Sequence, residues 1–320
     1  MSQPLILCCG EALVDMIPGR TADGAACYVP HAGGAVFNTA LALGRLGAPT
    51  GFLSGVSRDA FGRLLEGTLA EASVDLSRIV RADRPATLAF VELTDGKASY
   101  AFYDEGTAGR MLALSDLAPL GPEVGALFFG GISLVVEPAA ATYQALMARE
   151  GASRPVMVDP NIRPGFIGPG AAEARYRTRL SGMIAAADML KLSDEDLHWL
   201  LGSGDTLTLA RSLLAPEAAG QGPRIVFVTE GEKGATAVTR RGDRHRRAER
   251  VTVADTVGAG DTFNAGVLAA LSAAGALTRA GLARVGDGLL DQALDLAVRA
   301  AAITVSRPGA NPPWQRELAP

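Results

Sequence analysis

Residues 255–266 read D-T-V-G-A-G-D-T-F-N-A-G, with glycines on both sides of one acid, Asp261. A strand-like run at 250–253 precedes this turn, and an apolar run from 262 to 274 predicts that the turn opens a helix. Amides in the first turn of a helix lack internal partners and carry the positive end of the helix dipole, so an anion is favoured at 258–261. A carboxylate there would repel phosphate, so Asp261 makes better sense as a base that deprotonates an attacking hydroxyl. The alternative is that Asp261 only caps the helix.

Two N-terminal segments carry polar side chains that suit a hydroxylated ligand. The apolar run Leu5–Cys9 predicts a buried parallel strand, and Asp15 follows just past its carboxyl end, where open α/β sheets bind ligands. Gly33 and Gly34 precede a predicted helix and let a substrate approach closely, while Asn38 offers both a donor and an acceptor. The alternatives are a surface Asp in a turn and a core-facing Asn with partners inside the protein.

The composition of the 320-residue chain argues against several classes of protein. Its 30 basic and 34 acidic residues give a net charge of −4, so electrostatics do not favour a nucleic-acid or anionic-membrane partner. Three cysteines without C-x-x-C spacing, and no signal-peptide or membrane-spanning pattern, predict a reducing cytoplasmic location. No lysine precedes Ser or Thr, which excludes a Walker-type P-loop, and the lack of G-x-G-x-x-G argues against a dinucleotide site.

Strand and helix patterns alternate along most of the chain and predict an α/β fold with a central, mostly parallel sheet flanked by helices. Two strand-like runs, Thr87–Leu93 and Ser99–Tyr103, interrupt that alternation, with Asp95-Gly96 as their hairpin turn. Together with Gly19–Pro30 they predict a small separate sheet, which we interpret as a lid. The basic run Arg240–Arg247 lacks aromatic residues and predicts a solvated hairpin rather than a nucleic-acid surface.

The stretch at 255–266 closely resembles the C-terminal signature of the ribokinase-like, or PfkB, family of carbohydrate kinases, and His31–Ala40 resembles the N-terminal signature. The resemblance implies a three-layer α/β/α fold in which 1–320 form a single domain. It also implies a lid with strands from about 17–31 and 79–104 that forms a homodimer contact.

The same resemblance implies roles for individual residues. Asp261 would be the catalytic base, and the anion hole would be formed by the amides of Gly258, Ala259, Gly260 and Asp261. The sugar would be held by Asp15, Gly33, Gly34 and Asn38. Tyr103 lies in a segment that resembles the substrate-facing edge of fructokinase lids, although an aromatic residue there could equally be lid core. Arg163 ends a D-x-N-x-R pattern typical of fructokinase-like and ketodeoxygluconate-kinase-like branches and would lie near the phosphates or the sugar, unless it pairs with a surface carboxylate.

The nucleotide site is expected on the later strands. Thr229 to Gly234 resembles a T-x-G-x-x-G turn that lines an ATP site, and the full expected set is Lys191, Ser193, Thr229, Gly231, Gly234, Gly258 and Gly260. Ser193 and Asp196 predict a capping box and stand where relatives carry an N-x-x-E pattern that organises metal and phosphates. Asp in place of Glu shortens the reach and puts a direct metal role for Asp196 in doubt. Asp255 is the expected position of a monovalent cation, K⁺.

The expected activity is ATP-dependent phosphorylation of a primary hydroxyl of a small sugar, with fructose the first choice. Mg²⁺ is expected because the charge of the nucleotide phosphates must be neutralised for in-line transfer. 2-Keto-3-deoxygluconate is the alternative acceptor, but Asp104 and Glu105 on the lid edge would repel its carboxylate. A non-catalytic sugar- or nucleotide-binding regulatory protein with the same fold is the alternative of another class.

Overall fold

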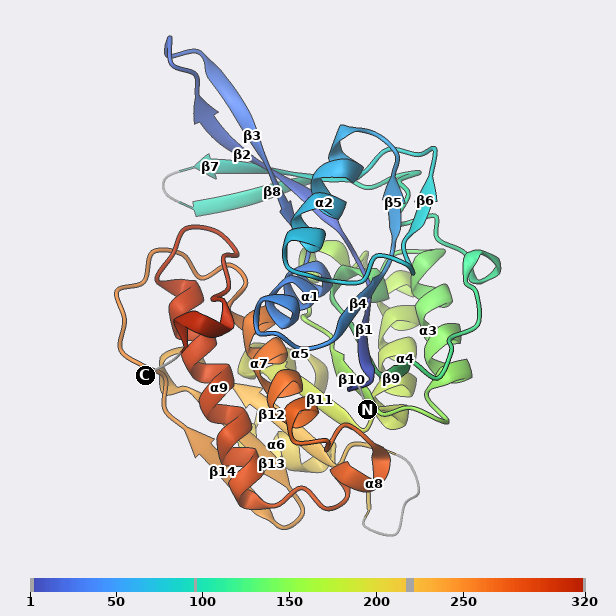
Figure 1. The fold of residues 1–320 in the computed structure, drawn as a ribbon, viewed down its shortest axis with the longest axis vertical. Coiled ribbons are helices and arrows are strands. Elements are labelled where there is room, and N and C mark those ends of the chain that lie inside the picture. Colours follow the sequence, from blue (N-terminus) through green and yellow to red (C-terminus); the bar gives the residue numbers. More distant parts are fainter. Residues whose placement is uncertain (1–2, 95–96, 217–221, 319–320) are drawn as a thin grey trace.

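The computed structural model describes residues 3–94, 97–216 and 222–318. A large sheet lies between two layers of helices, and a smaller sheet stands at one end (Figure 1). The strand order of the large sheet is β14-β13-β12-β11-β10-β9-β1-β4; the strands from β12 to β4 are parallel, and β13 is antiparallel to both its neighbours. These strands are β1 (Leu5–Cys9), β4 (Thr50–Leu53), β9 (Val124–Gly130), β10 (Val156–Asp159), β11 (Met189–Ser193), β12 (Ile225–Thr229), β13 (Ala235–Thr239) and β14 (Gly242–Arg246). The predicted α/β fold is confirmed.

Successive side chains of the central strands point alternately into two separate hydrophobic cores, one on each face of the sheet. Ile6 and Cys8 of β1 pack with one helical layer, whereas Leu7 and Cys9 pack with the other, as the two-residue period of a strand requires. The first layer contains α1 (Ala35–Arg45), α2 (Ala60–Glu71), α7 (Ala259–Ala273), α8 (Arg279–Leu282) and α9 (Asp287–Val305). The second contains α3 (Ala139–Glu150), α4 (Ala171–Ala186), α5 (Asp194–Leu201) and α6 (Thr206–Ser212). Short 3-10 helices are η1 (Leu114–Asp116), η2 (Gly131–Leu134), η3 (Pro164–Phe166), η4 (Gly231–Lys233) and η5 (Gln315–Glu317).

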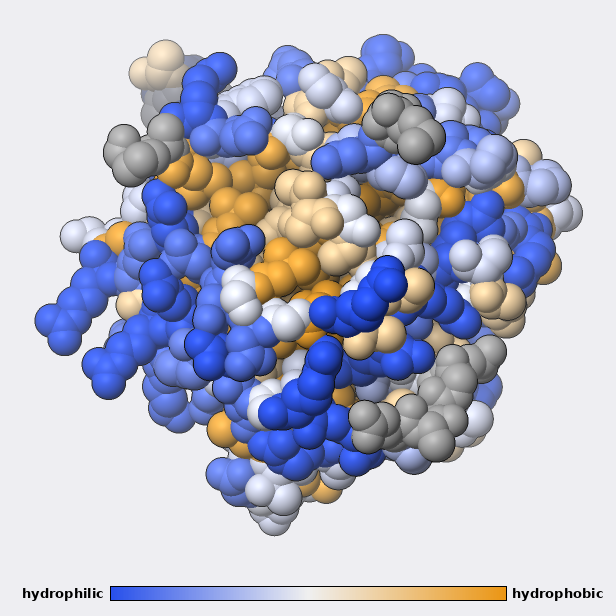
Figure 2. Space-filling model, turned by 60° about the horizontal axis from the view of Figure 1, so that its bottom comes forward, coloured by the Kyte–Doolittle hydropathy of each residue, from blue (hydrophilic) through white to orange (hydrophobic). Residues whose placement is uncertain are grey.

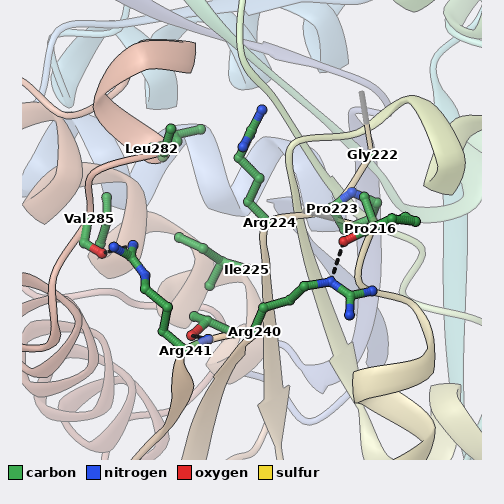
Figure 3. A pocket seen from close by; sticks show the side chains of 12 residues that line it. Pro216, Gly222, Pro223, Arg224, Ile225, Arg240, Arg241, Leu282 and Val285 are labelled. Carbon is green, nitrogen blue, oxygen red and sulfur yellow. Dashed lines mark hydrogen bonds between the residues drawn. The ribbon is translucent and has the colours of Figure 1, made fainter. Parts of the chain in front are cut away.

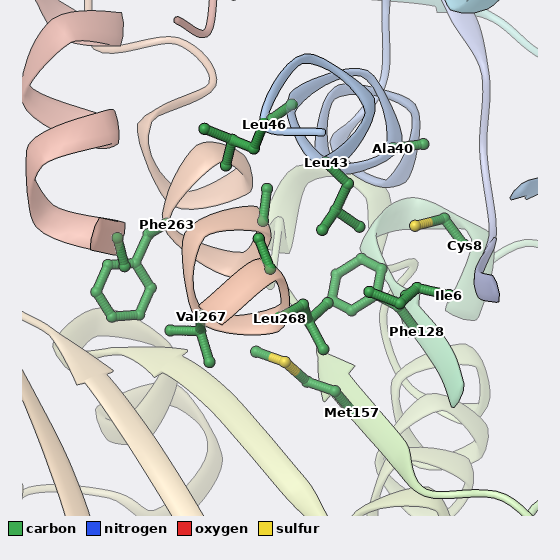
Figure 4. Packing of buried hydrophobic residues seen from close by; sticks show 14 of the residues in the cluster. Ile6, Cys8, Ala40, Leu43, Leu46, Phe128, Met157, Phe263, Val267 and Leu268 are labelled. Atoms are coloured by element: carbon green, nitrogen blue, oxygen red, sulfur yellow. The ribbon is translucent and has the colours of Figure 1, made fainter. Parts of the chain in front are cut away.

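Helix α7 is buried over most of its length and begins at the glycine-rich turn. Phe263, Val267 and Leu268 lie in one buried cluster with Leu43 of α1 and Phe128 of β9 (Figure 4). Because α7 contacts both α1 and α9 as well as the sheet, its sequence is apolar on nearly every side. This packing fixes the position of its first turn.

The smaller sheet has the order β3-β2-β7-β8 and is the small separate sheet that the sequence predicts, called the lid below after its expected role. Its strands are β2 (Leu13–Arg20), β3 (Ala26–Gly33), β7 (Thr87–Thr94) and β8 (Lys97–Tyr103). Its bounds correct the expected ones, since β2 begins at Leu13. Val80–Ala82 forms β6, which pairs with β5 (Gly55–Ser57) in a separate two-stranded sheet and does not belong to the lid. The turn expected at Asp95-Gly96 lies outside the described residues.

Two segments near the C-terminal half test the strand predictions further. The strand expected at 250–253 is wrong: these residues are exposed, and the next two amides, of Ala254 and Asp255, donate to the carbonyl oxygen of Val305 at the end of α9. The hairpin expected at Arg240–Arg247 is confirmed as β13 and β14, and two of its arginines form ion pairs with α9, Arg244–Asp291 and Arg246–Asp295.

Within the described ranges, no helix has the length and apolar character needed to cross a membrane.

Candidate active site

The first turn of α7 carries the acid that the sequence singles out. Gly258 precedes the helix with φ 78°, and a methyl group there would lie 2.8 Å from Cβ of Ala310, so glycine is required by both conformation and space. The amide of Ala259 makes a long 3.4 Å bond to the carbonyl oxygen of Thr256. The amides of Gly258, Gly260 and Asp261 have no acceptor within the part of the chain that the structure describes. These donors are therefore available to an anion.

Asp261 lies in the same turn and meets the predicted sugar-binding helix. Its side chain is 7% exposed, and Nδ2 of Asn38 in α1 donates to its Oδ2 over 3.0 Å. Oδ1 of Asn38 is buried and lacks a hydrogen-bond partner among the described residues. The structure thus joins the two segments that the sequence motifs placed far apart along the chain.

The environment of Asp261 changes its acidity. Burial raises the pKa of Asp261 to about 7, the negative charge of Asp159 adds to the shift, and the hydrogen bond from Asn38 opposes it. A carboxylate with a pKa near neutrality is suited to take a proton from a hydroxyl and release it again.

A buried ion pair lies beneath this turn. Nζ of Lys191 in β11 is 3.2 Å from Oδ2 of Asp159 at the end of β10, and Nδ2 of Asn264 donates to the same oxygen over 2.7 Å. A methyl group at Gly260 would lie 3.0 Å from Nζ of Lys191, so this glycine leaves room for the ammonium group. Burial alone would lower the pKa of Lys191, but the charges of Asp159, Asp196 and Asp261, together with the hydrogen bond to Asp159, outweigh it, and the pKa is raised. A permanent cation therefore stands against the start of α7.

The remaining predicted sugar residues lie at the base of the lid. Asp15 is part of β2, and a methyl group at Gly33 would come within 2.3 Å of its Oδ2, so Gly33 makes room for this carboxylate. Burial raises the pKa of Asp15 to about 6. Gly34 has φ 113° and directly precedes α1. Asp15 and Gly33 lie on the paired strands β2 and β3, and Gly34 connects β3 to α1, which carries Asn38.

Glu11 was not predicted as a site residue, yet it holds this region together. Its Oε1 accepts from the amide of Ala35 at the start of α1, and its Oε2 accepts from the amide of Ser133 in η2. Gly131 makes room for it, because a methyl group there would lie 2.0 Å from Oε1. The sequence signal that could have identified Glu11 is its place in residues 10–15, G-E-A-L-V-D, next to Gly10 and four residues before Asp15.

The strand period of the lid corrects the expectation for Tyr103. Asp15 pairs with Ala89, and Ala89 with Phe102, so these three side chains share one face of the lid. Tyr103 is on the opposite face, is 63% exposed, and packs edge-on against Phe90. Tyr100 shares the face of Asp15 and stacks on Phe102. Tyr100, not Tyr103, is the tyrosine of β8 that lies on the same face of the lid as Asp15, a predicted sugar-binding residue.

Asp104 also differs from expectation. Its Oδ1 accepts from the hydroxyl of Thr87 over 2.8 Å, and Arg110 lies 3.6 Å from its other oxygen. Burial raises the pKa of Asp104, and Arg110 opposes the shift. Because Arg110 offsets the charge of Asp104, this residue no longer argues against a sugar that carries a carboxylate. Glu105 is exposed, so its charge still argues against such a sugar.

The expected nucleotide residues gather at the carboxyl edge of the sheet. Ser193 is paired in register with Thr229, and Thr229 leads into the turn that contains Gly231 and Gly234. Gly234 has φ 103°, and a methyl group there would lie 2.0 Å from the carbonyl oxygen of Arg246. The turn is therefore built on glycine for reasons of backbone conformation and packing.

The two acids expected near cations both accept hydrogen bonds from backbone amides. Asp196 forms the predicted capping box with Ser193, and its other oxygen accepts from the amide of Ile162. Asp255 accepts from the amides of Val257 and Gly309. The described residues contain no group of three or more His, Cys, Asp or Glu side chains that could hold a metal ion.

A cavity of about 140 Å³ lies elsewhere, at the ends of β12 and β13 remote from Thr229 (Figure 3). It is lined in part by Arg224, Arg240 and Leu282 and includes none of the predicted site residues. Figure 2 shows the end of the molecule that faces away from the lid, where a band of hydrophobic side chains runs between hydrophilic ones. The predicted site is therefore at the lid end, distinct from this cavity.

Residues 3–317 match the family described as pfkB family carbohydrate kinase. The chain belongs to this family. Among its relatives, a fructokinase from Rhizobium leguminosarum bv. trifolii is 48% identical over 236 residues, which cover 74% of this chain and 70% of the relative.

Solved structures of family members agree with the fold. A fructokinase from Xylella fastidiosa with bound ATP is 28% identical, with a TM-score of 0.83, over 96% of this chain and 93% of that one. A fructokinase from Vibrio cholerae O395 with bound fructose, ADP and calcium ion is 25% identical, with a TM-score of 0.78, over 96% of this chain and 94% of that one. The ribokinase-like fold expected from the sequence is confirmed.

Proposed function

We propose that the chain transfers a phosphoryl group from ATP to a primary hydroxyl of fructose. The observation that carries the proposal is a buried carboxylate, Asp261, in the same helical turn as two amides without acceptors among the described residues. One group can remove a proton while the others stabilise negative charge. The relatives that are named fructokinases support fructose as the acceptor.

The proposed roles follow from the contacts. Asp261 accepts the proton of the attacking hydroxyl, and Asn38 holds its carboxylate in place. The amides of Gly260 and Asp261 donate to the phosphoryl oxygens, with Lys191 behind them as a fixed cation. Asp15 accepts hydrogen bonds from sugar hydroxyls, beside Gly33 and Gly34. ATP with its divalent cation supplies the phosphoryl group and neutralises part of its charge.

For the nucleotide we propose the edge formed by Ser193, Thr229, Gly231 and Gly234, which lies one to two strands from Asp159. Mg²⁺ is proposed as the divalent cation, held chiefly by the nucleotide phosphates and water. Asp255 and the segment at Gly309 are proposed as a K⁺ site, because the carboxylate already draws these two turns together.

We also propose that the small sheet closes over the sugar and excludes water during transfer. On the face of Asp15, Tyr100 and Phe102 would cover the bound sugar. The opposite face carries Tyr28, Phe90 and Tyr103, of which the two tyrosines are exposed, and this apolar face is proposed to bind the same face of a second copy.

A coupled assay of ADP release tests the proposal. Fructose, ketodeoxygluconate, ribose, tagatose and adenosine are each supplied with ATP and Mg²⁺, and fructose is expected to give the highest kcat/KM. A higher value with ketodeoxygluconate would replace fructose as the acceptor. No ADP with any of them, together with tight ATP binding, would favour a non-catalytic binding protein.

A further inference from the structure

Asp196 uses both carboxylate oxygens within the protein. Oδ2 accepts from the amide of Ser193 over 2.9 Å, which closes the capping box of α5, and Oδ1 accepts from the amide of Ile162 over 2.8 Å. The side chain is only 4% exposed. The second contact joins α5 to a loop more than thirty residues earlier in the chain, which a helix cap by itself does not require.

This geometry does not fit a resident metal ligand. A divalent cation takes carboxylate oxygens that face an open site, commonly with several waters. Both oxygens of Asp196 face backbone amides, and no cluster of three potential ligand side chains exists in the described ranges. The position that the sequence motif associated with metal is therefore occupied by a structural contact.

The loop that Asp196 holds presents Arg163. Asp159 begins the loop and accepts from the amide of Asn161, which adopts a positive φ of 44°. The amide of Ile162 then meets Asp196, and the exposed side chain of Arg163 follows directly. An arginine whose neighbouring backbone is fixed loses less conformational entropy when it binds an anion.

A second contact ties the far end of this loop to the lid. The ring of Phe166 in η3 packs on the ring of Phe102 in β8, with centroids 4.1 Å apart at 64°. Phe102 shares its face of the lid with Asp15. Arg163 therefore lies between an anchor on α5 and an anchor on the sheet that carries a sugar-binding residue.

We propose that Asp196 and Phe166 are positioning residues for Arg163, and that Asp196 serves as the anchor of this loop instead of as a metal ligand. The proposal rests on the proposed kinase function. Asp196 fixes the start of the loop against α5, and Phe166 fixes its end against the lid. Arg163 is thereby held where it can bind the transferred phosphate group or the sugar.

The first experiment needs no activity. Amide hydrogen exchange of the segment 160–167 is measured in the metal-free full-length protein for wild type, Asp196→Ala and Glu195→Ala. Glu195 is the matched control, because it is an exposed acid in the same helical turn. Exchange of this segment is expected to be about tenfold faster or more in Asp196→Ala and unchanged in Glu195→Ala. Unchanged exchange in Asp196→Ala would overturn the proposal.

The second experiment separates the loop from the metal. Asp196→Ala is expected to lower kcat/KM by about tenfold or more while the Mg²⁺ concentration for half-activation stays within about twofold of wild type. The double variant Asp196→Ala, Arg163→Ala should lose little more than Arg163→Ala, since both act through one loop. A large rise in the Mg²⁺ requirement, or fully additive losses, would contradict the proposal.

Phe166→Ala approaches the same loop from the lid side and replaces Asp196→Ala if the latter does not fold. Its loss of kcat/KM is expected to be non-additive with Arg163→Ala, and additive losses would again overturn the proposal. If wild type releases no ADP with any sugar, the kinase function fails, but the exchange experiment still decides whether Asp196 anchors the loop.

Discussion

At the scale of single residues, the proposed chemistry depends on the pKa of Asp261, which burial and neighbouring side chains determine. Burial raises its pKa, the carboxylate of Asp159 adds to this, and the amide of Asn38 opposes it. Lys191 and Asn264 hold Asp159 in turn. A base with these neighbours is balanced near neutral pH, and each neighbour has a separate, measurable effect on it.

Asp261→Asn is expected to lower kcat by about 10²- to 10⁴-fold, because the general base is lost while shape is retained. ATP binding, measured by calorimetry, should persist as the control for a folded nucleotide site. ADP release at the wild-type rate would contradict the role of Asp261.

The same substitution should stabilise the ligand-free protein at alkaline pH. Because the pKa of Asp261 is raised from 3.8 to about 7 by burial, the folded state favours the neutral acid and loses stability as pH rises through this range. Asn is neutral at every pH, so Asp261→Asn should raise the free energy of unfolding at pH 8 by up to about 4 kcal/mol. Urea unfolding at pH 8 measures this difference, which should shrink as pH falls; a constant difference would contradict the raised pKa.

The pH profile of kcat/KM should have an acid limb near pH 7, since only the ionised form of Asp261 accepts a proton. Asn38→Ala removes the hydrogen bond that lowers this pKa, so the limb should move to higher pH by about one unit. A limb that stays in place, or moves to lower pH, would assign it to another group.

At the scale of elements, the glycine-rich turn before α7 is held in place by the C-terminal segment and by the sheet. Gly258 faces Ala310 in the C-terminal segment, and Asp255 draws that segment in through the amide of Gly309. Arg45 at the end of α1 donates to Asn311 in the same segment. The start of α7 is therefore fixed from the sheet side by Lys191 and from the other side by the C-terminal segment.

Gly258→Ala tests this packing. Positive φ and the 2.8 Å approach to Ala310 should together lower the free energy of unfolding by about 2–3 kcal/mol and reduce activity. Gly275→Ala is the matched control: it follows α7, also has positive φ, but faces open space. It should cost about 1 kcal/mol and leave kcat unchanged. Equal effects on activity at both positions would contradict the packing argument.

At the scale of the whole molecule, the small sheet has two different faces. One carries Asp15, Phe102 and Tyr100, and the other carries the exposed Tyr28 and Tyr103. Exposed aromatic rings on an outer sheet face are typical of protein interfaces. The two faces match the proposed binding of substrate on one side and of a second copy on the other.

Tyr28→Asp combined with Tyr103→Asp should convert the proposed dimer to a monomer, because charge would be buried in an apolar contact. Light scattering after size-exclusion chromatography measures the mass. Leu201→Asp, at an exposed apolar residue remote from the lid, is the control and should stay dimeric. A monomeric wild type at micromolar concentration would refute the lid-mediated dimer.

Much of this molecule was determined by local sequence. The glycine turn before α7, the capping box of Ser193 and Asp196, and the alternation that gives a parallel sheet all depend on neighbours in the chain, and each was predicted correctly. The prediction of a strand at 250–253 was wrong because no strand among the described residues pairs with this backbone, which the local sequence pattern does not reveal.

Tertiary structure alone decided which side chains meet. Tyr100 and Tyr103 differ only in strand register, and register against β7 put Tyr100 on the face of Asp15. The contact of Asp196 with Ile162, and of Asn38 with Asp261, joins residues far apart in the chain. The type of a residue limits the chemistry of its side chain, but the burial and orientation of that side chain determine its charge and its partners. Burial and orientation are set only when the layers pack together.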